Sequence, residues 1–158
     1  VLNPAPAVPL PDDAWTLFDV LTPNQTEGLI LAGLDPETPL APREVLDALR
    51  SKTEASIVMT LGADGALVDD GGEVHHVPAF NPARIVDTTG AGDSFAGGMM
   101  GYLAEQGKFD PKTLKESLAF GTLAASFTVE DFSLDRLQKI DRSEIDTRLA
   151  EYRQMLAF

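Results

Sequence analysis

The residues best suited to chemistry lie in the segment from Asp87 to Gly98, which reads DTTGAGDSFAGG. A short apolar stretch ends just before it at Val86, and apolar residues at helical spacing follow it. The pattern predicts a strand, a turn of small residues and then a helix. Because the first four N–H groups of a helix have no intrahelical acceptor, we expect four amides here to converge on an anion. They belong to Gly90, Ala91, Gly92 and Asp93.

The carboxylate of Asp93 at this turn would repel a bound phosphate. The arrangement makes chemical sense if the amides hold a transferring phosphoryl group while Asp93 faces the attacking hydroxyl. Asp93 would then take the proton from that hydroxyl as its oxygen attacks phosphorus. The amides would stabilise the charge on the phosphoryl oxygens. The structural alternative is an ordinary helix start, with an acidic residue in the first turn and glycines for tight packing.

The complete segment resembles the C-terminal signature of the ribokinase-like (PfkB) family of sugar and nucleoside kinases. Three upstream segments are similar to family motifs and occur in the same order. They are NPAPA from Asn3 to Ala7, TPNQTE from Thr22 to Glu27 and TLGADG from Thr60 to Gly65. The resemblance covers nearly the whole chain.

The resemblance implies catalytic roles at the DTTGAGD turn. Asp93 corresponds to the catalytic base of the family. The three residues before it, Gly90, Ala91 and Gly92, correspond to its anion hole. The implied reaction is in-line transfer of the γ-phosphoryl group of ATP to a hydroxymethyl oxygen.

A monovalent-cation site is only partly matched. Asp87 and Thr89 correspond to residues of that site, which makes K⁺ a candidate cofactor. From Val129 to Ser133 the chain reads VEDFS, without the basic-Gly-Ala element that many family members carry there. K⁺ activation is therefore an open prediction.

A second metal is implied by Asn24 and Glu27, which match a family pair that helps to place Mg²⁺ near the phosphates, generally through water. Because Mg²⁺ keeps several of its waters, such indirect control is physically reasonable. Without the family context, the same two residues indicate a helix cap followed by a solvated glutamate in the first turn.

The nucleotide itself is expected beside Thr60, Gly62 and Gly65, which match the family turn next to ATP. Without the resemblance, these residues indicate an ordinary loop after a strand. Gly121 corresponds to a position that often touches adenine. Small residues at Gly121, Ala124 and Ala125 are equally well explained by close packing of helices.

The elements that must position these segments alternate between strands and helices, which predicts an α/β fold. We expect the C-terminal portion of a three-layer, Rossmann-like ribokinase-type fold with a largely parallel sheet. The expected strands are 56–61, 66–68, 73–77 and 84–87. The expected helical segments are 13–18, 24–32, 43–51, one that follows Gly92, one that starts at Asp110, and one with a capping box at 143–146.

Composition excludes several classes of function. The 158 residues carry a net charge of −13 at pH 7, which argues against non-specific binding to nucleic acid or anionic membranes. The absence of cysteine excludes disulfides and thiol catalysis and fits a cytoplasmic protein. Adjacent His75 and His76 point to opposite faces of a strand, so we expect no metal site there. No apolar run approaches the roughly 20 residues of a membrane helix.

A full family member is roughly twice this long, on the scale of larger α/β domains. We therefore expect residues 1–158 to be the nucleotide-binding and catalytic C-terminal portion, without the N-terminal half and its lid. Such a chain alone would not phosphorylate sugar, and an exposed sheet edge would favour a homodimer.

The expected activity is that of an ATP-dependent carbohydrate kinase, and Asn3–Ala7 favours a ribokinase-like sugar kinase. A nucleoside kinase, a non-catalytic nucleotide-binding fragment and an α/β interaction domain with a glycine turn are the alternatives. The acceptor, a sugar or a nucleoside, is not identified by the sequence.

Overall fold

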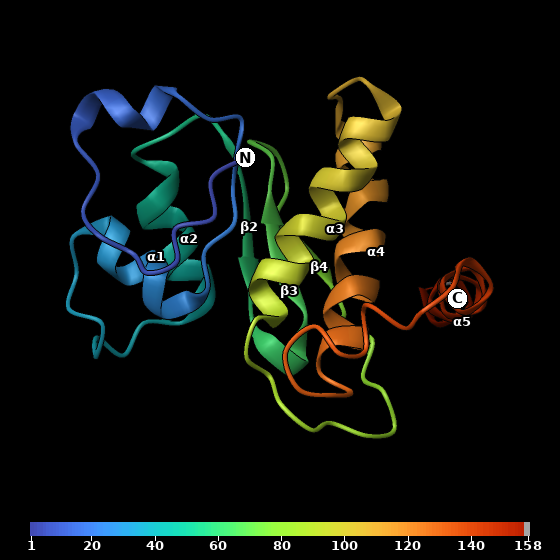
Figure 1. The fold of residues 1–158 in the computed structure, drawn as a ribbon. Helices are drawn as coiled ribbons and strands as arrows, with labels where there is room; N and C mark the ends of the chain where they lie inside the picture. Colours follow the sequence, from blue (N-terminus) through green and yellow to red (C-terminus); the bar gives the residue numbers. More distant parts are fainter. Residues whose placement is uncertain (157–158) are drawn as a thin grey trace. The chain divides into compact units, whose positions relative to one another are not determined.

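Two units make up the chain, Val1–Pro78 and Ala79–Phe158, of which the computed structural model describes residues 1–156. Figure 1 shows the order of their elements along the chain. All strands within the described residues belong to the N-terminal unit, whereas the C-terminal unit is built from helices and their connecting loops. None of the helices within residues 1–156 is both long enough and apolar enough to cross a membrane.

The sheet of the N-terminal unit contains four strands in the order β1-β2-β3-β4. They are β1 (Val20–Leu21), β2 (Ser56–Thr60), β3 (Ala66–Asp69) and β4 (His75–Val77). Strand β1 runs parallel to β2, and Leu2 forms a further parallel bridge to Leu21. Strands β2, β3 and β4 pair in antiparallel fashion.

The α/β class is thus confirmed, but the sheet is mixed rather than largely parallel. The reason is the length of the connections. The short 3-10 turn η2 (Gly62–Asp64) and the Asp70–Gly72 turn bring the chain straight back beside the strand it has just left, which produces antiparallel neighbours. A parallel neighbour needs a longer crossover, as β1 and β2 have through two helices.

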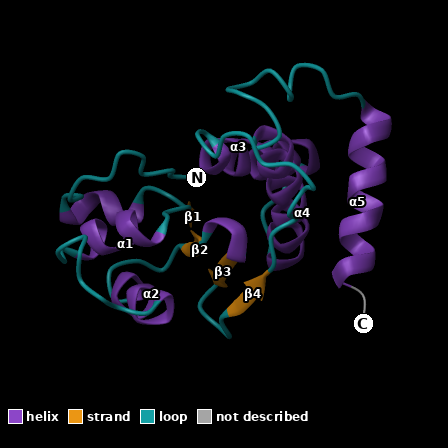
Figure 2. Cartoon of the chain, turned by 90° about the horizontal axis from the view of Figure 1, so that it is seen from below, coloured by secondary structure: helices purple, strands orange, loops and turns teal. Residues whose placement is uncertain are grey.

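Those two helices are α1 (Gln25–Ala32) and α2 (Pro42–Arg50), and the 3-10 helix η1 (Asp12–Thr16) precedes them. Helix α1 begins after Asn24 and ends at Gly33, whose φ of 82° is the left-handed conformation that glycine adopts without strain. These helices confirm the expected segments 13–18, 24–32 and 43–51. Their apolar faces form one core with β2. Figure 2 shows α1 and α2 lying beside the strands.

The C-terminal unit contains α3 (Ala91–Gln106), α4 (Pro111–Thr128) and α5 (Arg142–Leu156). Helix α4 begins as expected, since Asp110 Oδ1 accepts a hydrogen bond of 2.8 Å from Thr113 N–H. That hydrogen bond lowers the pKa of Asp110. The capping box of α5 lies two residues earlier than expected, because Asp141 Oδ1 accepts from Glu144 N–H at 2.9 Å.

The strand expected at 84–87 is wrong. Val86 N–H donates to the carbonyl oxygen of Val129 at 2.7 Å, just after the end of α4, instead of pairing with a strand. Apolar residues at 85 and 86 suggested a strand from pattern alone. A single main-chain contact at a helix end satisfies the backbone without a sheet neighbour.

Helices α3 and α4 pack closely against each other through a face that the sequence pattern anticipated. Phe95 and Met99 of α3 are buried, and the ring of Tyr102 stacks on Phe120 of α4 with centroids 4.5 Å apart. The two helices approach nearest at glycines. A Cβ atom at Gly98 would lie 2.6 Å from the carbonyl oxygen of Phe120.

Candidate active site

A pocket of about 330 Å³ opens in the N-terminal unit at the end of β2. Three residues that the sequence assigns to nucleotide and metal binding line it, namely Asn24, Thr60 and Gly62. Its other lining residues are Gln25, Thr26, Pro42, Leu61 and Asp64. The structure thus brings the TPNQTE and TLGADG segments to one place.

Backbone pairing explains why these two segments meet. Thr60 N–H donates to the carbonyl oxygen of Pro23 at 2.9 Å, and Asn24 forms a parallel bridge with Thr60. The segment before α1 therefore continues the parallel pairing of β1 with β2 as far as Thr60, the last residue of β2. Sequence reasoning missed the pocket residues Gln25, Thr26, Pro42 and Asp64. Pro42 lies at the start of α2, and no spacing pattern connects it with the other two segments.

Asn24 and Glu27 form a reciprocal capping box at the start of α1. Asn24 Oδ1 accepts from Glu27 N–H at 2.9 Å, and Glu27 Oε2 accepts from Asn24 N–H at 2.8 Å. The helix-cap alternative is therefore realised in the structure. The box uses only one of the two carboxylate oxygens of Glu27, so the donor set still suits a Mg²⁺ ion held through water.

The described part of the chain contains no cluster of side chains that could coordinate a metal ion directly. Within residues 1–156, no three or more His, Asp or Glu side chains gather where they could hold an ion. A metal at Asn24 and Glu27 would therefore depend on water and on the phosphates of its ligand.

The turn that lines the pocket is held by short hydrogen bonds. Gly65 has a φ of 90°, which favours glycine, and its carbonyl oxygen accepts from Leu61 N–H at 2.7 Å. His76 of β4 contacts the same turn, with its Nε2 2.6 Å from the carbonyl oxygen of Asp64. Because a carbonyl oxygen only accepts, His76 Nε2 must carry the hydrogen.

Replacing His76 with alanine is expected to loosen this turn. A single hydrogen bond contributes about 1 kcal/mol, which corresponds to roughly fivefold faster amide exchange. Nuclear magnetic resonance can follow the amide of Gly65, which donates to the carbonyl oxygen of Gly62. His75→Ala is the matched control on the same exposed strand. Equal exchange rates in the two variants would contradict the prediction.

The DTTGAGD turn lies in the C-terminal unit. Asp87 Oδ1 accepts from Thr89 N–H at 3.0 Å, and hydrogen bonds from the Thr89 backbone and hydroxyl lower the pKa of Asp87. Gly90 has a φ of 78° and immediately precedes α3. The glycine thus allows the chain to turn sharply from the Asp87 loop into the helix.

The prediction of four converging amides is wrong for Ala91. Its N–H donates to the carbonyl oxygen of Thr88 at 3.2 Å, because the turn closes on itself before the helix begins. Gly92 and Asp93 lie in the first turn of α3. An α-helix offers a first-turn amide such as that of Gly92 no acceptor four residues earlier. Both residues are exposed, so the carboxylate of Asp93 is not withdrawn into the core.

Gly121 is accounted for by helix packing. A Cβ atom there would lie 2.8 Å from the carbonyl oxygen of Phe95 and 3.1 Å from its ring. The close approach of α3 and α4 therefore requires glycine. Contact of Gly121 with a nucleotide stays a prediction.

K⁺ binding at Asp87 and Thr89 stays a prediction. Asp87 Oδ1 accepts a hydrogen bond from Thr89 N–H. Glu130, in the segment that lacks the basic-Gly-Ala element, pairs with Arg136 and Arg148.

Similarity to known proteins identifies the family of the chain. The profile described as "pfkB family carbohydrate kinase" matches residues 1–139. The ribokinase of Haemophilus influenzae is 36% identical over 129 residues, which are 82% of this chain and 40% of that protein. The chain therefore spans about two fifths of the length of this relative.

Solved structures show the same likeness. The ribokinase of Thermotoga maritima has a TM-score of 0.71 and 27% identity, over 94% of this chain and 48% of that one. The ribokinase of Arabidopsis thaliana, solved with ribose and ATP, has a TM-score of 0.70 and 26% identity. That match covers 90% of this chain and 44% of the other.

Proposed function

Because the chain belongs to the pfkB family of carbohydrate kinases, we propose that it serves the ATP-dependent phosphorylation of a sugar hydroxymethyl group. The observation that carries the proposal is the start of α3, where the exposed carboxylate of Asp93 and the amide of Gly92 share the first turn. A ribose-type sugar is favoured over a nucleoside by the Asn3–Ala7 segment and by the ribokinase relatives. Residues 1–158 would be the nucleotide-binding and catalytic portion of the kinase.

The C-terminal unit would carry the chemical step. Asp93 would accept the proton of the hydroxymethyl group while its oxygen forms a bond to the γ-phosphorus and the bond to ADP breaks. The amides at the start of α3 would stabilise charge that spreads over the transferring oxygens. Ala91 is excluded from this role because its N–H is already donated to Thr88.

The N-terminal unit would bind the nucleotide in the pocket at the end of β2. Asn24, Thr60 and Gly62 line this pocket and would face the phosphates. Glu27 is not a lining residue, but it is hydrogen-bonded to Asn24 and would help to hold the waters of a Mg²⁺ ion. When bound, Mg²⁺ neutralises phosphate charge. The η2 turn and the start of α1 provide small and polar groups there, which suits an anionic ligand accompanied by a cation.

The experiment that tests the proposal is thermal denaturation of the 158-residue chain with nucleotides. Saturating Mg·ATP, at about 100 times its dissociation constant, should stabilise the folded chain by about 2.7 kcal/mol and raise Tm. Mg·AMP, which lacks the β- and γ-phosphates, is the matched control ligand and should shift Tm less. No shift with Mg·ATP, or an equal shift with Mg·AMP, would count against the proposal.

A further inference from the structure

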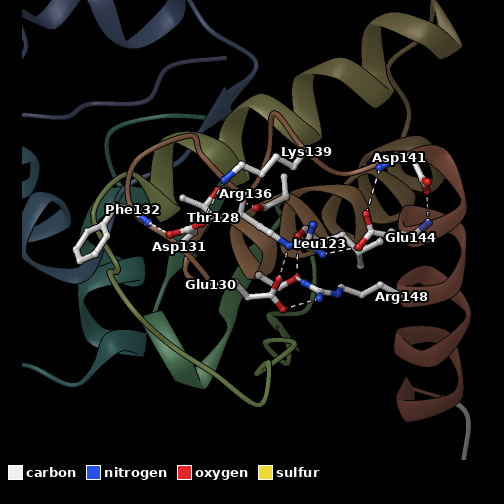
Figure 3. A network of polar contacts seen from close by, with 12 residues as sticks. Leu123, Thr128, Glu130, Asp131, Phe132, Arg136, Lys139, Asp141, Glu144 and Arg148 are labelled. Atoms are coloured by element: carbon white, nitrogen blue, oxygen red, sulfur yellow. Dashed lines mark hydrogen bonds and ion pairs between the residues drawn. The ribbon is translucent and has the colours of Figure 1, made fainter.

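A network of charged side chains connects the end of α4 with α5 and the loop between them (Figure 3). Its centre is Glu130, whose two carboxylate oxygens accept from different arginines. Arg136 Nε donates to Oε2 at 3.0 Å, and Arg148 Nη2 donates to Oε1 at 2.6 Å. We call Glu130, Arg136, Glu144 and Arg148 the Glu130 network.

The centre of the network is largely shielded from solvent and makes further contacts. The side chains of Glu130 and Arg148 are only 18% and 14% exposed. Arg148 also donates to Ser126 Oγ at 3.0 Å, and its guanidinium lies 3.6 Å from the ring centre of Phe127. Arg136 reaches a second carboxylate, that of Glu144. Charge-assisted hydrogen bonds in such a setting hold their partners in one geometry.

Val129, which directly precedes Glu130, connects this network with the DTTGAGD turn. The carbonyl oxygen of Val129 accepts from Val86 N–H at 2.7 Å and, at 3.4 Å, from Asp87 N–H. Asp87 in turn accepts from Thr89 N–H, directly before Gly90 and the first turn of α3. The peptide bond from Glu130 to Val129 and these hydrogen bonds together connect Glu130 with the residues that precede Asp93.

We propose that the Glu130 network is a positioning device for the Asp87 turn, acting through the carbonyl of Val129. The segment 79–90 has no helix or strand of its own, so no ladder of regular backbone hydrogen bonds holds it before α3 begins. The only main-chain bonds that Val86 and Asp87 donate to residues outside their own turn, among those of the described chain, end on Val129. Because Glu130 directly follows Val129, holding its side chain would restrict the motion of that carbonyl beyond what the end of α4 already imposes.

The inference rests on the proposed function for its purpose, since an anion hole must be held in place before the reaction. Its structural part stands independently. A network that only anchors α5 would stabilise the C-terminal unit as a whole, whereas a positioning device protects the 86–90 segment selectively. Amide exchange separates these two behaviours.

The test is hydrogen exchange in the complete 158-residue chain, followed by nuclear magnetic resonance. Glu130→Ala is expected to speed exchange at Val86 and Asp87 by about tenfold. Amides in the middle of α4, such as that of Leu118, should stay unchanged. Glu130→Gln, which retains size and one acceptor, should rescue part of the protection and keeps the test valid where the alanine variant fails to fold.

Lys139→Ala is the control variant. It removes an exposed ion pair with Asp131 in the same loop but none of the contacts that connect Glu130 with the Asp87 turn. Equal acceleration at Leu118 and Val86, or unchanged exchange at Val86 in both Glu130 variants, would overturn the proposal. Selective acceleration without any stabilisation by Mg·ATP would support the positioning role and defeat the proposed function instead.

Discussion

Under the proposed function, Asp93→Asn is expected to lower kcat by about 10²–10⁴-fold and to leave ATP binding nearly unchanged. Asparagine has the same size as aspartate but cannot accept the proton of the attacking hydroxyl. The variant also keeps the main chain at the start of α3, so that amides of the first turn continue to bind phosphate. A loss confined to kcat would therefore identify a proton acceptor rather than a helix-stabilising residue.

The measurement couples ADP release to turnover with a panel of sugars, and compares ATP affinity of the two proteins separately. Glu105→Gln is the matched control, because it neutralises an exposed acid at the other end of the same helix. Its kcat should equal that of the parent. Near-normal turnover by Asp93→Asn would contradict the assignment of Asp93 as the base, even though the chain belongs to the pfkB family.

Local sequence patterns predicted helix ends correctly, because the residues concerned act in the same way at any helix end. Asn24 and Asp110 cap their helices, and Gly33 ends α1, because side-chain oxygens and left-handed glycine satisfy helix ends in any context. The motif segments were equally informative. Their order predicted the ribokinase-type α/β fold, which the match to the Thermotoga maritima structure confirms.

Predictions failed where the partner of a backbone group decides the outcome. The apolar stretch before Asp87 has the composition of a strand, but the acceptor of Val86 N–H is a helix end. The amide of Ala91 was expected to face an anion, but Thr88 takes its hydrogen bond. Val129 lies far from Val86 in the sequence, and the bond from Ala91 to Thr88 belongs to a turn of small and polar residues. Hydrophobic spacing contains no information about either bond.

The Glu130 network likewise could not be predicted, because the partners of its side chains lie in different segments of the chain. Glu130, Arg136 and Arg148 have no fixed spacing, and each alone would be read as a solvated surface residue. Their partial burial against Phe127 becomes apparent only when α5 packs on α4. Charge pattern within one helix therefore predicts caps and neighbouring pairs, but not networks that join three segments.

Gly98→Ala is the second large effect, and it concerns stability. The new Cβ atom would lie 2.6 Å from the carbonyl oxygen of Phe120 and 2.8 Å from Cβ of Ala124. Neither atom can rotate away, so α3 and α4 must move apart. Overpacking of this kind costs about 1–3 kcal/mol. The gain in helix propensity from glycine to alanine, about 1 kcal/mol, offsets only part of it.

Gly101→Ala is the control that isolates this cost. It lies one turn further along α3, and a Cβ atom there meets nothing within 4 Å. Both variants gain the same helix propensity, so the difference between their free energies of unfolding reports the packing alone. Urea denaturation should place Gly101→Ala above the parent and Gly98→Ala about 1–3 kcal/mol below Gly101→Ala. Equal midpoints would show that α3 and α4 can separate at no cost, and the tight contact at Phe120 would not be a constraint on the fold.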